Sequence, residues 1–124
     1  MRVVLVGVCG SGKSTLAQGL VRLGYEVKEC RQEHSGVPYM WQVLSRPDVL
    51  ICLDASAEEI VRRGRHFYAT GLLDDQRKRL AHARAHSDLY LMTDGLDATE
   101  VLERVTAFLA DHAKRPTDLT DGTG

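Results

Sequence analysis

The feature that most constrains this chain is the segment G-V-C-G-S-G-K-S at residues 7–14, which satisfies the pattern G-x-x-x-x-G-K-[ST]. An apolar, β-rich run at residues 3–6 precedes it, and leucines at helical spacing follow it at Leu16, Leu20 and Leu23. Glycine tolerates the backbone angles of a tight loop and lets main-chain N–H groups approach a ligand closely. A strand, a glycine-rich loop and a helix in direct succession therefore predict a site where loop amides and a helix N-terminus bind phosphate.

Most positions of this segment have a predicted role. The side chain of Lys13 is expected to reach the β- and γ-phosphates of a nucleotide, and the Ser14 hydroxyl is expected to ligate Mg²⁺. Thr15, at the next helical position, can reach the α-phosphate. The predicted nucleotide contacts of the segment are Gly7, Cys9, Gly10, Ser11, Gly12, Lys13, Ser14 and Thr15. The predicted cofactors are ATP and Mg²⁺, with Ser14 as the metal ligand.

The rest of the chain alternates strand and helix patterns. Further strands are predicted at residues 25–30, which alternate as an edge strand does, at 49–54 and at 89–92. A short helix is predicted from Pro38 to about Leu44. A second, capped by Ser56 and Glu59, is predicted to run through Gly64, Phe67 and Tyr68 to about Thr70–Gly71. An arginine-rich helix with the apolar stripe Leu73, Leu80 and Ala83 follows, and Asp97 and Glu100 cap the last helix. Strands joined by helices pair in parallel through right-handed crossovers. The expected fold is therefore a three-layer α/β/α sandwich around about four parallel strands.

Composition suits a globular chain: of 124 residues, 44% are hydrophobic and 27% charged. We expect a single domain at residues 1–114 and a flexible polar tail at residues 115–124. The net charge of −1 lacks the positive field on which nonspecific nucleic-acid or membrane binding rests. No apolar run reaches the length of a membrane span and no export signal is visible. The odd number of cysteines, 3, suits reduced thiols, so the expected location is cytoplasmic.

Together these segments resemble the P-loop kinase superfamily, and within it the small shikimate-kinase-like and nucleoside-monophosphate-kinase-like branch. Besides residues 7–14, the resemblance covers residues 20–30, D-V-L-I-C-L-D-A-S-A-E-E-I-V-R-R at 48–63, S-D-L-Y-L-M-T-D-G-L at 87–96 and the final helix at 97–109. It implies the P-loop nucleoside triphosphate hydrolase fold and an ATP-dependent phosphotransferase. Family members carry a further strand and a larger acceptor-binding segment where this chain has only residues 31–47, so the chain resembles a shortened member.

A basic cluster lies between residues 62 and 84, where Arg62, Arg63, Arg65, Arg77, Lys78, Arg79 and Arg84 outnumber the acids. Planar guanidinium groups can clamp phosphate oxygens and stack on bases. By the resemblance, Arg77 or Arg79 points at phosphate or at the acceptor. The alternative interpretation is a helix with ordinary solvated charges.

The resemblance also assigns the nucleotide base and the lid. It implies that Arg63 lies on one face of the adenine and that the turn containing Gly95 and Leu96 lies on the other. It further implies that Arg62 and Arg65 belong to a short lid that takes part in catalysis.

A carboxylate is expected near Ser14, to hold Mg²⁺ through water or to accept the proton of the attacking hydroxyl. Glu29, Glu33 and Asp54 are the candidates. We favour Glu33 as the catalytic acid, with Asp54 next because it ends an apolar run. The alternative interpretation of Glu29 and Glu33 is that they are ordinary charged loop residues in contact with solvent.

Histidines suggest a metal site less strongly. His82 and His86 are four residues apart on a predicted helix, and Cys30 with His34 forms another loose pair. Zinc is not the favoured reading of either pair, because no third ligand accompanies them. His34 is of interest for an acceptor pocket, while residues 39–41 are expected to form a hydrophobic plug over the sheet.

The predicted function is that of a small Mg²⁺-dependent kinase that transfers the γ-phosphoryl of ATP to a small-molecule acceptor. The alternative is a nucleotide-binding module or slow ATPase that regulates a protein partner. A GTPase is disfavoured because the chain has no N-K-x-D motif. No nucleic-acid or membrane partner is expected.

Overall fold

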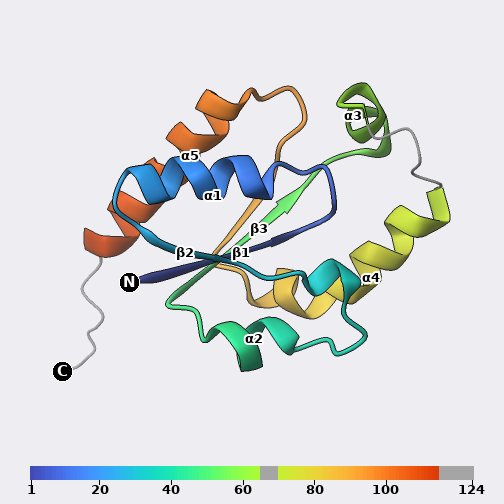
Figure 1. Ribbon diagram of the computed structural model, residues 1–124, viewed down its shortest axis with the longest axis horizontal. Helices are drawn as coiled ribbons and strands as arrows, with labels where there is room; N and C mark the ends of the chain where they lie inside the picture. Colours follow the sequence, from blue (N-terminus) through green and yellow to red (C-terminus); the bar gives the residue numbers. More distant parts are fainter. Residues whose placement is uncertain (65–69, 115–124) are drawn as a thin grey trace.

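The computed structural model describes residues 1–64 and 70–114 of the chain. Its elements follow the order β1 (Arg2–Gly7), α1 (Lys13–Arg22), β2 (Glu26–Glu29), the 3-10 helix η1 (Gln32–His34), α2 (Met40–Ser45), β3 (Val49–Asp54), α3 (Ala57–Arg62), α4 (Thr70–His86), β4 (Leu89–Met92) and α5 (Ala98–Lys114). Strands are separated by helices along the chain, as the hydrophobic patterns predict (Figure 1).

The described residues form one parallel sheet of four strands in the order β2-β1-β3-β4, which confirms the predicted α/β fold. The edge position of β2 agrees with its alternating sequence. Central pairing joins Val3 through Gly7 of β1 to Val49 through Leu53 of β3. The chain goes from β1 to one neighbour and then crosses to the other side of β1. The carboxyl ends of β1 and β3 are therefore the place where ligands bind in sheets of this kind.

Helices cover both faces of the sheet, which gives the three predicted layers (Figure 1). Val3 and Leu5 belong to a buried cluster with residues of α1 and α5, whereas Val4 and Val6 belong to a second cluster with residues of α2 and α4. Successive residues of a strand point to opposite faces, so a continuous apolar run is needed to fill both clusters. The central strands are buried for that reason.

The end of the helix after Ser56 differs from the expectation. The helix after Ser56 ends at Arg62, not near Thr70–Gly71, and α4 begins at Thr70. Gly64, which the apolar pattern predicts on a helical face, has a φ of 93° and provides the left-handed stop after α3. Phe67 and Tyr68, expected in the same helix, lie outside the described residues.

The start of α2 also differs, because Pro38 lies in a turn before the helix. Met40 N donates to Val37 O across this turn, and the helix begins at Met40.

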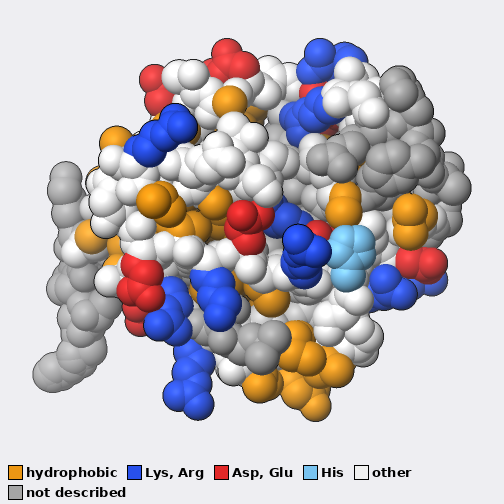
Figure 2. All heavy atoms as spheres, in the orientation of Figure 1, with side chains coloured by type: hydrophobic (Ala, Val, Ile, Leu, Met, Phe, Trp, Pro, Cys, Tyr) orange, Lys and Arg blue, Asp and Glu red, His pale blue; other side chains and the backbone are white. Residues whose placement is uncertain are grey.

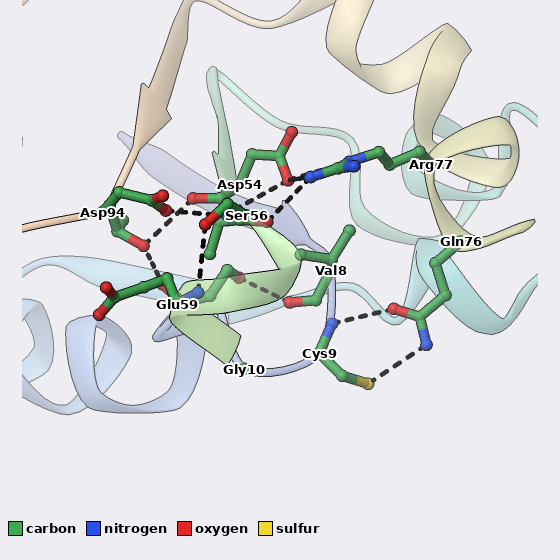
Figure 3. Close-up of polar contacts among 12 residues, drawn as sticks. Val8, Cys9, Gly10, Asp54, Ser56, Glu59, Gln76, Arg77 and Asp94 are labelled. Carbon is green, nitrogen blue, oxygen red and sulfur yellow. Dashed lines mark hydrogen bonds and ion pairs between the residues drawn. The ribbon is translucent and has the colours of Figure 1, made fainter. Parts of the chain in front are cut away.

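Side-chain caps hold the starts of α3 and α5. Asp97 and Glu100 exchange side-chain hydrogen bonds with each other's backbone N–H groups, which confirms that capping box. Only half of the other predicted box forms. Ser56 Oγ accepts from Glu59 N, but Ser56 N donates to Asp94 instead of to Glu59 (Figure 3). The Glu59 carboxylate is thus left for other partners.

The surface mixes both signs of charge. Figure 2 shows basic and acidic side chains intermingled across one face, with hydrophobic side chains at its lower edge, over α2 and the turn before it. Tyr39 and Val43 are among the exposed large hydrophobic residues there. Within residues 1–64 and 70–114, no helix has the length and apolar character needed to span a membrane.

Gly7 tests the packing between the central strands. A Cβ at Gly7 would lie 2.4 Å from the backbone oxygen of Leu53, a distance that only backbone movement can relieve. We expect Gly7→Ala to lower the free energy of unfolding by about 2 kcal/mol or more, the range of overpacked cores. Gly36→Ala is the matched control, because a Cβ there meets nothing within 4 Å. Urea unfolding of both variants checks this, and equal losses would contradict it.

Candidate functional site

The glycine-rich loop, residues 7–14, connects β1 directly to α1. Gly10 and Gly12 have φ angles of 84° and 101°, which non-glycine residues rarely adopt. Ser11 is buried, and its hydroxyl donates to Val8 O at 2.7 Å. The loop is therefore held by its own contacts, and the first N–H groups of α1 lie at its end.

Lys13 and Glu33 form the central ion pair of the site. Lys13 Nζ lies 2.5 Å from Glu33 Oε2 and donates to Gly7 O at 2.6 Å. The two side chains are only 10% and 4% exposed, respectively. η1 supplies the glutamate, so the structure brings together the lysine and the carboxylate that sequence reasoning favoured.

Ser14 and Glu29 form a second polar pair at the mouth of the site. Ser14 Oγ, in the first turn of α1, donates to Glu29 Oε1 at 2.9 Å. Glu29 ends β2, the neighbour of β1. A hydroxyl and a carboxylate thus lie side by side next to Lys13.

Cys9 has contacts that sequence reasoning missed. Its N–H donates to Gln76 Oε1 at 3.0 Å, and Figure 3 shows Gln76 reaching from α4 to the loop. Cys9 Sγ lies 3.3 Å from His34 Nε2. The sequence suggests a loose pair of Cys30 and His34, and the structure places Cys9 in contact with this ring. Gln76 has a signal in the sequence, since it lies three residues from Leu73 on the buried face of α4.

Arg63 and Thr93 close the other side of the loop. Arg63 donates to Gly10 O at 2.7 Å and to Thr93 O at 2.8 Å. The Thr93 hydroxyl lies 3.1 Å from Ser11 O, and the residue is buried. Thr93 was also missed, although its place directly after β4 is a signal that could have found it.

Glu59 holds the two arginines at the end of α3. Arg62 pairs with its carboxylate, and Arg63 Nε donates to it at 2.9 Å. The hydrogen bond from Arg62, with the charges of both arginines, keeps the pKa of Glu59 below its ordinary value. Arg62 is thereby engaged with its own helix. The expected lid residue Arg65 lies outside the described residues.

Asp54 belongs to a separate network behind the loop. Its carboxylate accepts from Ala55 N at 2.8 Å, from Arg77 at 3.2 Å and from the Tyr90 hydroxyl at 2.6 Å. Figure 3 shows Arg77 of α4 directed at Asp54. The pKa of Tyr90 is raised to about 12, mainly because the phenol is shielded from water and also because it donates a hydrogen bond to Asp54.

Asp54 and Arg77, both candidates from the sequence, are partners of each other in this network. Both oxygens of Asp54 have protein partners. Arg77 points at Asp54 and Ala55 O, whereas the resemblance implies that Arg77 or Arg79 points at phosphate or at the acceptor. Arg79 donates to the backbone oxygen of Glu33 at 3.4 Å.

Two adjoining cavities flank the loop. The first, of about 290 Å³, has apolar walls from Leu16, Leu96 and Val101 beside Ser11, Asp97 and Ala98. The second, of about 460 Å³, is polar and is lined by Cys9, Lys13, Ser14, Glu29, Arg31, Glu33 and His34, among others. Gly10, Gly12, Thr15 and Arg63 line both. Leu96 is thus part of a cavity wall, and Gly95 has a φ of 74° in the turn before it.

His82 and His86 pack in a different arrangement from a metal pair. Their rings stack with centroids 4.3 Å apart, and Trp41 Nε1 donates to His82 Nδ1 at 3.1 Å. Trp41 is buried against the sheet, as expected for the plug, whereas Tyr39 is half exposed. Among the described residues, the group able to hold a metal ion is instead Cys9, Glu33 and His34.

Comparison with known proteins identifies a similar fold. No protein family and no curated protein matches the sequence significantly. The structure is similar to an unliganded sugar kinase from Janibacter sp. HTCC2649, with a TM-score of 0.62 and 19% identity over 88% of this chain and 94% of that chain. At this identity the likeness shows a shared kinase-like α/β fold and nothing finer.

Thiol reactivity tests the placement of the cysteines. Cys9 is partly exposed in the second cavity, whereas Cys30 and Cys52 are buried, and burial raises the pKa of Cys52 to about 12. Because the thiolate is the reactive form, we expect an aromatic disulfide reagent to modify one thiol quickly in the native chain and all of them in denaturant. Cys9→Ser should remove the fast phase. A fast phase that survives this substitution would contradict the assignment.

Proposed function

We propose that this chain is a small kinase that transfers the γ-phosphoryl of ATP to a hydroxyl-bearing small molecule, with residues 7–14 as its phosphate-binding loop. The observation that carries the proposal is the position of Lys13, at the start of α1 and in the polar cavity that adjoins an apolar one through Gly10 and Arg63. An apolar pocket joined to a polar pocket matches the two ends of a nucleotide triphosphate.

The first cavity suits the base. Leu16, Leu96 and Val101 offer apolar contacts, and the guanidinium of Arg63 supplies a planar cation on which an adenine can stack. The hydrogen bonds of Arg63 to Gly10 O and Thr93 O fix this group before any ligand arrives. This supports the assignment of Arg63 and Leu96 to the nucleotide.

The second cavity suits the phosphates. The loop amides and the N-terminal end of α1 favour an anion there, and Lys13 supplies a full positive charge. Phosphate oxygens compete with Glu33 for Lys13, and a charge-assisted contact to phosphate replaces the one to the carboxylate. Binding of the nucleotide therefore releases Glu33 for another task.

Glu33 is then placed to act as the general base. The acceptor hydroxyl oxygen forms a bond to the γ-phosphorus, the bond from that phosphorus to the β–γ bridging oxygen breaks, and ADP leaves. The hydroxyl proton passes to Glu33. Gly7 O and the loop keep Lys13 beside the transferred group, where it offsets the charge of the transition state.

Ser14 and Glu29 fit a magnesium ion, because their hydroxyl and carboxylate oxygens are hard donors that adjoin each other and the second cavity. When bound, Mg²⁺ neutralises charge on the phosphates. Ser14 would bind it directly, and Glu29 would bind it directly or orient its water.

The acceptor would occupy the outer part of the second cavity, near Arg31 and His34. These residues can donate hydrogen bonds to hydroxyl or carboxylate oxygens. Sugars are the first class to test, since the structurally similar protein is described as a sugar kinase. Nucleosides, nucleotides and small hydroxy acids complete the panel.

Ligand-dependent stability tests nucleotide binding. We expect Mg-ATP at a hundredfold excess over its dissociation constant to stabilise the native chain by about 2.7 kcal/mol. Lys13→Ala should remove most of this effect, while Lys78→Ala, at an exposed position of α4, should retain it. Thermal denaturation measures both. An unchanged melting temperature of the wild-type chain with Mg-ATP would refute nucleotide binding.

Acceptor-dependent turnover tests the role of Glu33. Glu33→Gln keeps an acceptor for Lys13 but cannot take up the proton, so turnover should fall by about 10² to 10⁴ while Mg-ATP still stabilises the fold. Glu103→Gln, an exposed carboxylate of α5, is the control and should be as active as the wild type. Full activity of Glu33→Gln would exclude Glu33 as the base.

Tight ATP binding with no acceptor-dependent turnover in the wild-type chain would favour the alternative function, a nucleotide-binding module or slow ATPase.

A further inference from the structure

Three side chains with metal-binding atoms converge beside the glycine-rich loop. Cys9 comes from the loop itself, and Glu33 and His34 come from η1. Cys9 Sγ lies 3.3 Å from His34 Nε2 and 3.9 Å from Glu33 Oε2, and the latter two atoms are 3.8 Å apart. We call these residues the three-donor cluster. The phosphotransfer proposed above uses Glu33 as the base and places the acceptor near His34, but it gives the thiol of Cys9 no role.

The distances match those between ligands of a tetrahedral zinc ion. Zinc binds sulfur at about 2.3 Å and nitrogen or oxygen at about 2.0 to 2.1 Å, so tetrahedral angles place sulfur about 3.5 Å from the other donors and nitrogen about 3.3 Å from oxygen. Each distance in the cluster is within about 0.5 Å of these values. Small side-chain rotations would be enough to bring the three donors onto one ion.

Glu33 gives independent evidence for a ligand. Its side chain is only 4% exposed, and its Oε1 has no hydrogen-bond partner among the described residues, while Oε2 is paired with Lys13. A buried carboxylate oxygen without a partner is costly, and an ion that is not part of the protein is one of the few physical explanations. The oxygen that faces Cys9 and His34 is Oε2, so a cation there would remove this cost if it contacted both oxygens of the carboxylate.

The donor types select the ion. Mg²⁺ and Ca²⁺ prefer oxygen ligands, whereas a thiolate with an imidazole and a carboxylate favours zinc and ions that resemble it. Three protein ligands leave the fourth position open, which is the arrangement of zinc ions that also bind water or a substrate. We propose that Cys9, Glu33 and His34 bind one divalent cation of the zinc class, with its open position in the second cavity.

Lys13 makes the site adjustable. Its ammonium group contacts the same oxygen, Glu33 Oε2, that faces Cys9 and His34. The ion and the lysine therefore compete for this carboxylate and repel each other. Removal of the positive charge of Lys13 should tighten ion binding by about fivefold or more, the factor for two unit charges 4 Å apart in water. Binding of the ion needs no nucleotide, so it does not depend on the proposed kinase function.

Cobalt titration tests the proposal directly. Co²⁺ is added to the chelator-treated, reduced full chain without nucleotide, and the near-ultraviolet thiolate-to-cobalt charge-transfer band is followed; Zn²⁺ is then added as competitor. We expect one Co²⁺ ion to bind per chain and to give the charge-transfer band. Zn²⁺ should then displace the cobalt and abolish the band. As the ion binds, the Cys9 thiol gives up its proton to the buffer.

Variants assign the ligands. Cys9→Ser should abolish the charge-transfer band, and His34→Gln should weaken Zn²⁺ binding by about tenfold or more, whereas Lys13→Ala should strengthen it. His86→Gln is the matched control, because this exposed histidine of α4 lies outside the cluster, and it should bind as the wild type does. Melting curves of each apo variant show whether it is folded.

Three results would overturn the proposal: cobalt binding without a thiolate band, zinc binding of unchanged affinity in folded Cys9→Ser and His34→Gln, or no tightening in Lys13→Ala. Loss of Mg-ATP binding with the zinc results intact would refute only the kinase function.

Discussion

The pairing of β1 with β3 is the constraint on which the rest of this structure depends. It places Gly7 against the backbone of Leu53 so closely that a side chain there would meet the Leu53 oxygen at 2.4 Å. Both strands end at the same edge of the sheet, and β4 ends beside them. Thr93, just after β4, bridges Ser11 O and Asp54 O at 3.1 Å each. The glycine-rich loop is therefore supported by the ends of all three strands.

Two polar networks divide the charged residues at this edge. Lys13 and Glu33 lie in the polar cavity, where the pair is nearly excluded from water and each charge depends on the other. Asp54, Arg77 and Tyr90 instead connect β3, α4 and β4. The acid at the end of the central strand is thus used to join elements. Among the described residues, the acid on η1 keeps one oxygen without a partner, which is one reason why we propose it as the base.

Much of the fold could be predicted, because its signals are local. The buried runs of β1 and β3, the edge character of β2 and the Asp97–Glu100 box are all visible within a few residues of sequence. The end of α3 was predicted wrongly, since an apolar stripe was given more weight than Gly64, whose left-handed backbone ends the helix there. Glu59 was predicted as a capping partner, but two arginines one turn later compete for its carboxylate.

The candidate site was predictable only in part. Lys13 and Ser14 follow from the motif, and Glu33 was favoured as the acid. The position of Gln76 on the buried face of α4 is a local signal, but it does not show that Gln76 would bind the loop at Cys9, 67 residues away. The same holds for the 24- and 25-residue separations of Cys9 from Glu33 and His34.

The sequence by itself determined the order of strands and helices along the chain and the place of the glycine-rich loop, because hydrophobic periodicity and glycine act over a few residues. Only the tertiary structure decided which side chains meet at that loop. Strand order and crossovers bring distant segments to one edge of the sheet, and competition among neighbouring charges then selects the partners: Asp54 with Arg77, and Glu33 with Lys13.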